Sequence, residues 1–581
     1  MKKEVAFILL VLLITPIVNA KKGHMQLLAI SQTKEGLRGA GADLDLEIKP
    51  GIGRVFISTF PLTKVDTQLS FRIAKEYACD FLSLECNNYD FFYEVRSDAP
   101  IVGGPSAGAA ATALTIIVLE DLTADPSATV TGTIESGGMI GPVAGIKEKI
   151  EAAQRLGLRT VLIPEGKRYQ KDNNSNSTID LVEYGAELEI SVAEVIEIRD
   201  VILLLTGFEF AAESDIINID SQYTATMMQI ANGLCERSKT LLMDINISYI
   251  KPNNLQLEEA ANLTSSATNA LENGEYYAAA SYCFGANVKY QYLRLASKDL
   301  SIGRIEEMIA ETQEFILTSK QGITGFQYAT ITDLQTYLIV SERLKEAQQY
   351  LEESSDELEY NNTDNAVYNL AFAVERWNSA VSWSQFFGMD GRQFAINDKS
   401  LRQLCIQKVS EATERLEYTK SFISVNMDEL SKDLDVAEQD MMLGNNELCI
   451  FRASKVKARA SLILSSISIS KDEVEEFLQK KLTLARRTIV KETRRDIFPI
   501  LGYSYYEYAE SLSHSDPFSS LLYAELALEL SSFDMYFKNT RLFSWSFDLG
   551  TFTLILGSML VGYALAVVIF RWELQKKKRK K

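Results

Sequence analysis

The spacing of apolar residues divides the chain into an alternating first part and a long helical second part. In the first part, short apolar stretches with strand periodicity alternate with amphipathic helical stretches. In the second part, helical spacing continues nearly throughout, and glycine and proline are scarce. We therefore expect an α+β layer domain at residues 21–207, followed by an all-α region at residues 208–543.

The first part predicts a specific order of elements. Strands are expected at residues 25–31, 42–48, 53–59, 91–95 and 159–164, helices at residues 67–82, from 106 onward and at 145–157, a hairpin at residues 127–143, and a final strand and helix ending near residue 205.

The second part contains four segments that predict helical hairpins, each with a polar turn. They lie at residues 267–288, 355–377, 438–460 and 508–530. In the first three, two alanines seven residues apart recur at a constant offset of 87 residues, as Ala279 and Ala286, Ala366 and Ala373, and Ala453 and Ala460. Small residues at this spacing let two helices pack closely, as in tetratricopeptide solenoids. The fourth segment breaks the offset, and an irregular helical bundle explains the pattern equally well.

The N-terminus is typical of a secretory signal peptide. Residues 1–20 contain Lys2 and Lys3, then an apolar run, and end in small residues at the positions of a signal-peptidase site. We expect the mature chain to begin at Lys21.

The C-terminus predicts a membrane anchor. Residues 549–570 form an apolar segment of 22 residues without charge, enough to cross a bilayer core about 30 Å thick. Residues 571–581 carry seven basic side chains against Glu573, so this tail should remain in the cytoplasm. The expected topology is a single-pass protein of the cell membrane that contacts the lipid bilayer through this helix, with its N-terminal ectodomain outside.

Charge and cysteine content restrict the expected partners and permit disulfides. The formal net charge is −19, of which the first 20 residues contribute +1 and the tail +6, so the part between them carries about −26. Such a surface repels phosphate backbones, and nucleic acid is not an expected partner. All six cysteines lie in the exported part, where disulfides are permitted. Cys79 and Cys86 would be about 10 Å apart, too far to bridge, if both lay on one helix.

The stretch "GGPSAGAAATALTIIVLEDL" at residues 103–122 places a serine at the start of an apolar helix. Pro105 suits the first helical turn, and Gly104 allows close approach of another backbone or a substrate carbonyl. Ser106 then lies where free backbone N–H groups and the positive end of the helix dipole meet. It is either a helix cap or a nucleophile beside an oxyanion hole.

A nucleophilic serine needs a base, and the sequence offers few candidates. The chain contains two histidines, His24 and His514, and both are far in sequence from Ser106, so a Ser-His-Asp triad is not expected. The predicted helix at 145–157 carries Lys147 and Lys149, which point about 200° apart. Lys149 lies nearer the apolar stripe of this helix, where burial would lower its pKa; two surface lysines are the alternative.

At this point the sequence resembles a known family. The segments "GPSAG", "TGTI" and "GPVAGIKEKIEAAQRLGLRTVLIPEG", continuous over about sixty residues from 104 to 165, resemble the proteolytic domain of Lon proteases. The resemblance implies that Ser106 is the nucleophile and that Lys149 is the base. It also implies that the hydroxyl of Thr131 hydrogen-bonds near the lysine, with Gly104 and Pro105 supporting the serine.

Three features depart from the Lon pattern. The acidic residue that commonly precedes the GPSAG motif is Gly103 here, and the glutamate of TGE is Thr133. No G-x-x-x-x-G-K-[ST] nucleotide-binding loop occurs in the sequence, so the Lon ATPase is not expected. The chain is most similar to membrane-bound archaeal Lon-like proteins that lack the ATPase.

These observations predict an ATP-independent serine endopeptidase without metal or cofactor, which acts on flexible or unfolded polypeptides. Self-association into a homo-oligomer is compatible with the sequence. The alternative is a non-catalytic surface scaffold that retains a Lon-like domain and binds a partner through its helical region.

Overall fold

The computed structural model describes most of the chain. The described residues are 20–33, 36–171, 178–211, 216–246, 254–422, 426–466, 469, 473–537 and 549–578. Residues 1–19 of the expected signal peptide and residues 579–581 of the basic tail lie outside this part.

The N-terminal domain contains a four-stranded mixed sheet in the order β1-β2-β4-β3. Its strands are β1 (Lys21–Thr33), β2 (Gly36–Pro50), β3 (Val55–Thr63) and β4 (Tyr89–Val102). β2 pairs antiparallel with both β1 and β4, and β3 pairs parallel with β4. The expected first three strands and the strand at 91–95 are therefore present, and each is longer than its apolar stretch.

A second sheet is fully parallel, in the order β11-β8-β5. It consists of β5 (Ala128–Val130), β8 (Thr160–Pro164) and β11 (Ser191–Val195). The hairpin expected at 127–143 is only partly right: β6 (Thr133–Ile134) and β7 (Ile140–Gly141) pair antiparallel, but β5 leaves them to join β8. A small two-stranded pair, β9 (Tyr169–Lys171) and β10 (Thr178–Asp180), was not expected from the sequence.

Helices cover these sheets and enclose two apolar cores. They are α2 (Val65–Phe81), α3 (Gly108–Leu119), α4 (Ile146–Arg155), α5 (Leu181–Glu187) and α6 (Ile198–Thr206). Every residue of α3 is buried, which explains its uninterrupted run of small and apolar side chains. α4 packs against β2, where a Cβ on Gly39 would lie only 1.8 Å from the carbonyl oxygen of Glu148, so the close approach of this helix requires glycine.

All six cysteines form disulfides: Cys79–Cys86, Cys235–Cys283 and Cys405–Cys449. The first becomes feasible because α2 ends at Phe81 and Cys86 lies in the 3₁₀ turn η1 (Cys86–Asn88). The two Cα atoms are 6.0 Å apart, so the assumption of one continuous helix does not apply.

The described part of the helical region contains four helical hairpins, each preceded by a further long helix. The hairpins are α8 (Leu255–Glu272) with α9 (Tyr276–Ala296), α11 (Ile331–Glu359) with α12 (Thr363–Trp383), α14 (Asp428–Leu443) with α15 (Asn446–Ser466), and α17 (Ile500–Leu512) with α18 (Pro517–Ser531). The preceding helices are α7 (Ser221–Met243), α10 (Ile302–Ile323), α13 (Asp398–Phe422) and α16 (Val474–Thr493).

The repeated alanines occupy buried positions on the second helix of the first three hairpins. Ala279, Ala286, Ala366, Ala373, Ala453 and Ala460 each have no exposed surface. Their helices α9 and α12 pack against each other, and α15 packs against α18. The alanine pattern thus marks close helix contacts, as expected.

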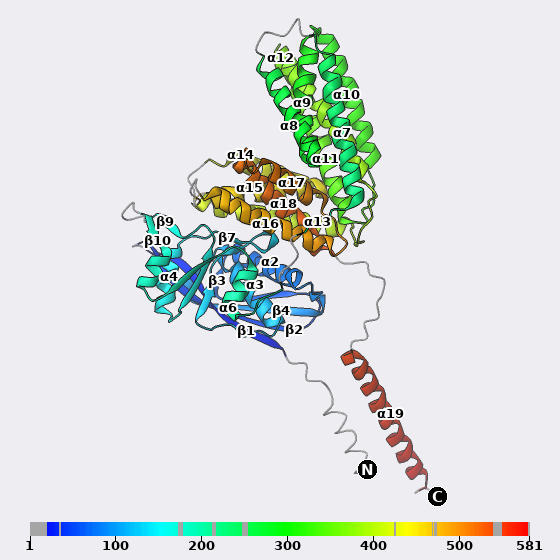
Figure 1. Ribbon diagram of the computed structural model, residues 1–581. Helices are drawn as coiled ribbons and strands as arrows, with labels where there is room; N and C mark the ends of the chain where they lie inside the picture. Colours follow the sequence, from blue (N-terminus) through cyan, green and yellow to red (C-terminus); the bar gives the residue numbers. More distant parts are fainter. Residues whose placement is uncertain are drawn as a thin grey trace.

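The six helices α13 to α18 lie between the N-terminal domain and the helices α7 to α12 (Figure 1). Among the described residues, the domain that carries Ser106 contacts the later half of the helical region through α13, α15, α16 and α18. Below we call α7–α12 the distal helices and α13–α18 the proximal helices.

The last helix, α19 (Leu549–Lys578), stands apart from the rest of the protein (Figure 1). Within it, the 21 residues Leu556–Lys576 are long and apolar enough to cross a membrane, and none of this segment is buried by other residues.

Candidate active site

Ser106 lies in η2 (Pro105–Ala107), the 3₁₀ turn that leads into α3. Neither η2 nor α3 has a side-chain cap, so the interpretation of Ser106 as a helix cap is wrong. The side chain is half-buried. Among the residues that the structure describes, its Oγ makes no hydrogen bond, which leaves the hydroxyl available for chemistry.

Hydrogen bonds hold the turn before Ser106 against the start of α2. Gly104 adopts φ 100°, a conformation that residues with a side chain rarely take, and its N–H donates to Asp66 Oδ2 at 3.0 Å. The Thr67 hydroxyl donates to the Gly104 carbonyl at 3.3 Å. Asp66 and Thr67 thus position the serine turn. The sequence analysis missed both, although an aspartate in the first turn of a helix could have suggested an anchoring role.

Lys149 is buried on the inner face of α4, with 1% of its surface exposed. Its Nζ donates a hydrogen bond to Thr131 Oγ1 at 2.8 Å. Burial lowers the pKa of this lysine to about 7, and the nearby Glu148 opposes the effect only weakly. In the described part of the chain, no carboxylate forms an ion pair with Lys149, so the protonated amine has no direct counter-ion.

Lys147 points away from this position, as the helix geometry predicts. It is only half-buried, and its Nζ lies 5.6 Å from the centre of the Tyr184 ring. The two histidines are also elsewhere: His24 contacts Asp45 on the outer sheet, and the side chain of His514 is 86% exposed.

The short segment after β5 joins the serine turn to the lysine. Gly132 N–H donates to the Ser106 carbonyl at 3.2 Å, and Ala109 N–H donates to the Gly132 carbonyl at 3.0 Å. The residue before Gly132 is Thr131, which accepts from Lys149. The structure therefore gathers all three polar residues of the expected site around one backbone segment, without a direct hydrogen bond between Ser106 and Lys149.

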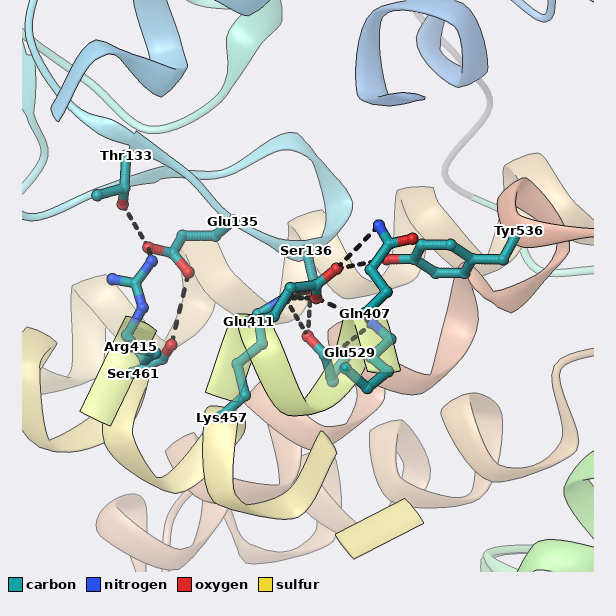
Figure 2. Close-up of polar contacts among 11 residues, drawn as sticks. Thr133, Glu135, Ser136, Gln407, Glu411, Arg415, Lys457, Ser461, Glu529 and Tyr536 are labelled. Carbon is teal, nitrogen blue, oxygen red and sulfur yellow. Dashed lines mark hydrogen bonds and ion pairs between the residues drawn. The ribbon is translucent and has the colours of Figure 1, made fainter. Parts of the chain in front are cut away.

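Beyond this segment, the chain enters the boundary with the proximal helices (Figure 2). Glu135 is buried, accepts a hydrogen bond from the Thr133 hydroxyl and forms an ion pair with Arg415 of α13, at 2.5 Å. Ser461 of α15 donates to the other carboxylate oxygen at 3.5 Å.

A second buried group of charges lies next to it (Figure 2). The hydroxyl of Ser136 donates to Glu529, and Lys457 contacts both Glu529 and Glu411, at 3.0 and 2.8 Å. Lys408 bonds Glu529 at 2.6 Å, so two lysines balance two glutamates. Burial by itself raises the pKa of Glu411 and Glu529, but the lysines outweigh it: they hold the pKa of Glu411 at about 2 and lower that of Glu529. These ion pairs join the proximal helices to one another, and the hydrogen bonds of the Ser136 hydroxyl attach the loop that follows Thr131 to them.

One group of carboxylates has a spacing that a metal ion would accept. Carboxylate oxygens of Asp80, Glu492 and Asp534 lie within 4.8 Å of one another. However, Asp80 already pairs with Lys491 and with Arg495, the latter at 2.7 Å. These two cations supply the positive charge that the cluster requires, so the group acts as a second polar contact between α2 and the proximal helices.

Comparison with known proteins identifies the class of the N-terminal domain. Residues 76–203 match the family model of the Lon protease (S16) C-terminal proteolytic domain. The domain is therefore of the Lon proteolytic type, which is a serine protease domain.

Several Lon proteases are similar to this domain. A Lon protease of Paraburkholderia phytofirmans is 34% identical over 120 residues, which are 20% of this chain and 15% of that protein. The peroxisomal Lon protease homolog 2 of Eremothecium gossypii is 36% identical over 110 residues, or 19% and 10% of the two chains. A Lon protease of Roseiflexus castenholzii is 41% identical over 76 residues, or 13% and 10%. The chain thus spans only 10 to 15% of the length of these relatives.

The structure adds a physical account of one departure from the Lon pattern. Thr133 replaces the glutamate of the TGE motif, but its hydroxyl bonds the carboxylate of Glu135, two residues later. That carboxylate is neutralised by Arg415 from a distant part of the chain. An acidic group is therefore present near this position, but it is paired with Arg415 of α13.

Proposed function

We propose that the protein is a membrane-anchored serine endopeptidase that acts outside the cytoplasm without ATP, with Ser106 as nucleophile and Lys149 as general base. The observation that carries this proposal is the state of Lys149. A buried lysine without a carboxylate partner, with a pKa of about 7, is neutral in about half of the molecules at neutral pH and can then accept a proton.

In the proposed mechanism, Thr131 accepts one N–H of the neutral Lys149 amine and so directs its lone pair toward the serine. Lys149 takes the proton of Ser106 as Oγ attacks the peptide carbonyl. Backbone N–H groups at the start of η2 and α3 stabilise the oxyanion. The lysine then returns its proton to the leaving amine, an acyl-enzyme forms, and water releases it by the same route.

The surroundings of Ser106 favour extended substrates. A small cavity of about 20 Å³ lies beside Pro105, and its wall includes residues of the proximal helices, namely Glu411, Glu414, Arg415 and Lys457. A substrate that approaches this side must pass between two folded bodies held together by buried ion pairs. We therefore propose that the protein cleaves flexible or already unfolded polypeptides and that the helices screen what reaches the serine.

The proposed location rests on two further features. The three disulfides are compatible with an oxidising compartment, and α19 is long enough to serve as an anchor. Independence from ATP is proposed because the sequence has no nucleotide-binding loop of the Walker A type.

The test is proteolysis of unfolded casein by the full-length protein in detergent, beside Ser106→Ala as the matched control. We expect cleavage by the wild type without added nucleotide and none by the variant. Absence of cleavage by the wild type across the neutral and alkaline range would support the non-catalytic scaffold. Equal cleavage by both proteins would exclude Ser106 as the nucleophile.

A further inference from the structure

A cavity with charged and aromatic walls lies in the described helical region, where the distal helices meet the proximal helices. It has a volume of about 370 Å³, within the range of about 300–1,000 Å³ that is usual for small-molecule sites. Its wall is formed by α7, α9, α11 and α12 on one side and by α15, α17 and α18 on the other. Sites between packed bodies of this kind are common places for ligands.

Four cationic side chains line this cavity, against a single lining carboxylate, Glu342. Three of the cations are already neutralised. Lys455 donates to Glu342 at 3.0 Å, Arg376 pairs with Glu346, and Arg459 pairs with Glu429 and Asp433.

The fourth cation, Arg343, has no carboxylate of its own in the described structure. It is 9% exposed, its guanidinium donates to the Ser379 hydroxyl, and its Nε makes no hydrogen bond. The guanidinium carbon lies 4.9 Å from the centre of the Trp383 ring. A buried arginine without an anion is costly, because removal from water is not offset by an ion pair. Such a group is suited to bind an anion from outside.

The rest of the wall is aromatic and apolar. It includes Tyr277, Phe284, Trp383, Tyr505, Tyr508 and Tyr523. Burial raises the pKa of the Tyr277 and Tyr505 hydroxyls, so they stay protonated and can donate hydrogen bonds to an anion. One unpaired positive charge within apolar walls matches a ligand with one negative charge and an apolar body.

We propose that this cavity is a binding site for a small monocarboxylate with an aromatic or aliphatic body, whose carboxylate pairs with Arg343. The body of the ligand lies against the tyrosines and Trp383. Because its wall comes from both groups of helices, a bound ligand joins the distal helices to the proximal helices. The proposal concerns binding alone and is independent of the chemistry at Ser106.

The test is calorimetric titration of the full-length protein in detergent with hydrocinnamate, beside its neutral amide hydrocinnamamide. We expect saturable binding of the acid and binding of the amide that is about 10- to 100-fold weaker, as for loss of a charge-assisted hydrogen bond. This comparison requires no variant. Equal affinities, or no saturable binding of the acid at millimolar concentrations, would overturn the proposal.

Variants locate the site. Arg343→Met should reduce the affinity for hydrocinnamate by a similar factor. Arg343→Lys keeps the charge but loses the planar guanidinium, so its affinity should lie between those of Arg343→Met and the wild type. Arg304→Met, which removes an exposed arginine of α10, is the matched control and should bind as the wild type. Unchanged affinity in a folded Arg343→Met protein would refute the assignment. Tight binding of inorganic phosphate without binding of hydrocinnamate would refute the proposal that the ligand has an apolar body.

Discussion

The amine of Lys149 donates a hydrogen bond to the hydroxyl of Thr131 over 2.8 Å, in a position where both side chains are 1% exposed. This contact orients the lysine, and Gly132, the next residue along the chain, holds the backbone of Ser106.

Replacement of Lys149 should remove the activity, whereas replacement of Lys147 should not. Loss of a general base typically costs about 100- to 10,000-fold in rate, and only Lys149 faces the interior. We expect this loss in kcat of casein cleavage for Lys149→Ala and near wild-type kcat for Lys147→Ala. Equal losses in the two variants would show that the assignment of the base is wrong.

Activity should rise with pH through a midpoint near 7. Burial lowers the pKa of Lys149 to about 7, and the neutral amine, which predominates above that value, is the form that accepts a proton. The measurement is kcat/KM for an unstructured peptide as a function of pH. A midpoint near 10.4, the ordinary value for lysine, would mean that the amine is solvated in the active protein.

The same burial should make Lys149 a cost to stability. Its folded pKa, about 7, lies below its unfolded value of about 10.4, so the unfolded state binds the proton more readily between these values. The penalty grows as the pH falls from about 10.4 to about 7 and is constant below that. Lys149→Met should therefore raise the unfolding temperature of the N-terminal domain at pH 7, with the gain shrinking toward pH 10.

Calorimetry with Lys147→Met as control checks this expectation. The buried Thr131 hydroxyl, which Lys149→Met leaves without its donor, offsets part of the gain by about 1 kcal/mol. A lower unfolding temperature for Lys149→Met at pH 7, with no change for Lys147→Met, would contradict it.

The ion pair between Glu135 and Arg415 should control how firmly α13 is held against the N-terminal domain. Both side chains are buried, at 4% and 3% exposed. Arg415→Met therefore leaves the charge of Glu135 uncompensated and should lower the free energy of unfolding by about 3–5 kcal/mol. The double variant Glu135→Gln with Arg415→Met should recover much of this loss. Hydrogen exchange of α13 amides reports the effect, and equal protection in the single and double variants would argue against it.

We expect the chain to cross the membrane with its N-terminal part outside the cell and its C-terminal tail in the cytoplasm. Protease added to intact cells should remove the ectodomain and spare an epitope placed after Lys581, because the basic tail favours the cytoplasmic side. Digestion of that epitope in sealed cells would place the tail outside and remove the argument for an ATP-free compartment.

Local patterns in the sequence were sufficient for much of the fold and for the candidate residues. The alternation of short apolar stretches predicted most of the strands of the first domain, and the seven-residue alanine spacing predicted the buried positions on three helices. The choice of Lys149 over Lys147 followed from the amphipathic face of α4, because side chains two positions apart on a helix point in different directions. These inferences depend on neighbours within a few turns of the chain.

Tertiary structure alone decided the contacts between distant segments. Glu135 and Arg415 are 280 positions apart, and neither position suggests a partner in a single sequence. The Cys79–Cys86 disulfide depends on where α2 ends, a boundary that periodicity places poorly. The pKa of Lys149 and the missing partner of Arg343 are set by desolvation and by which charges fold around each group, and both quantities are properties of packing in three dimensions.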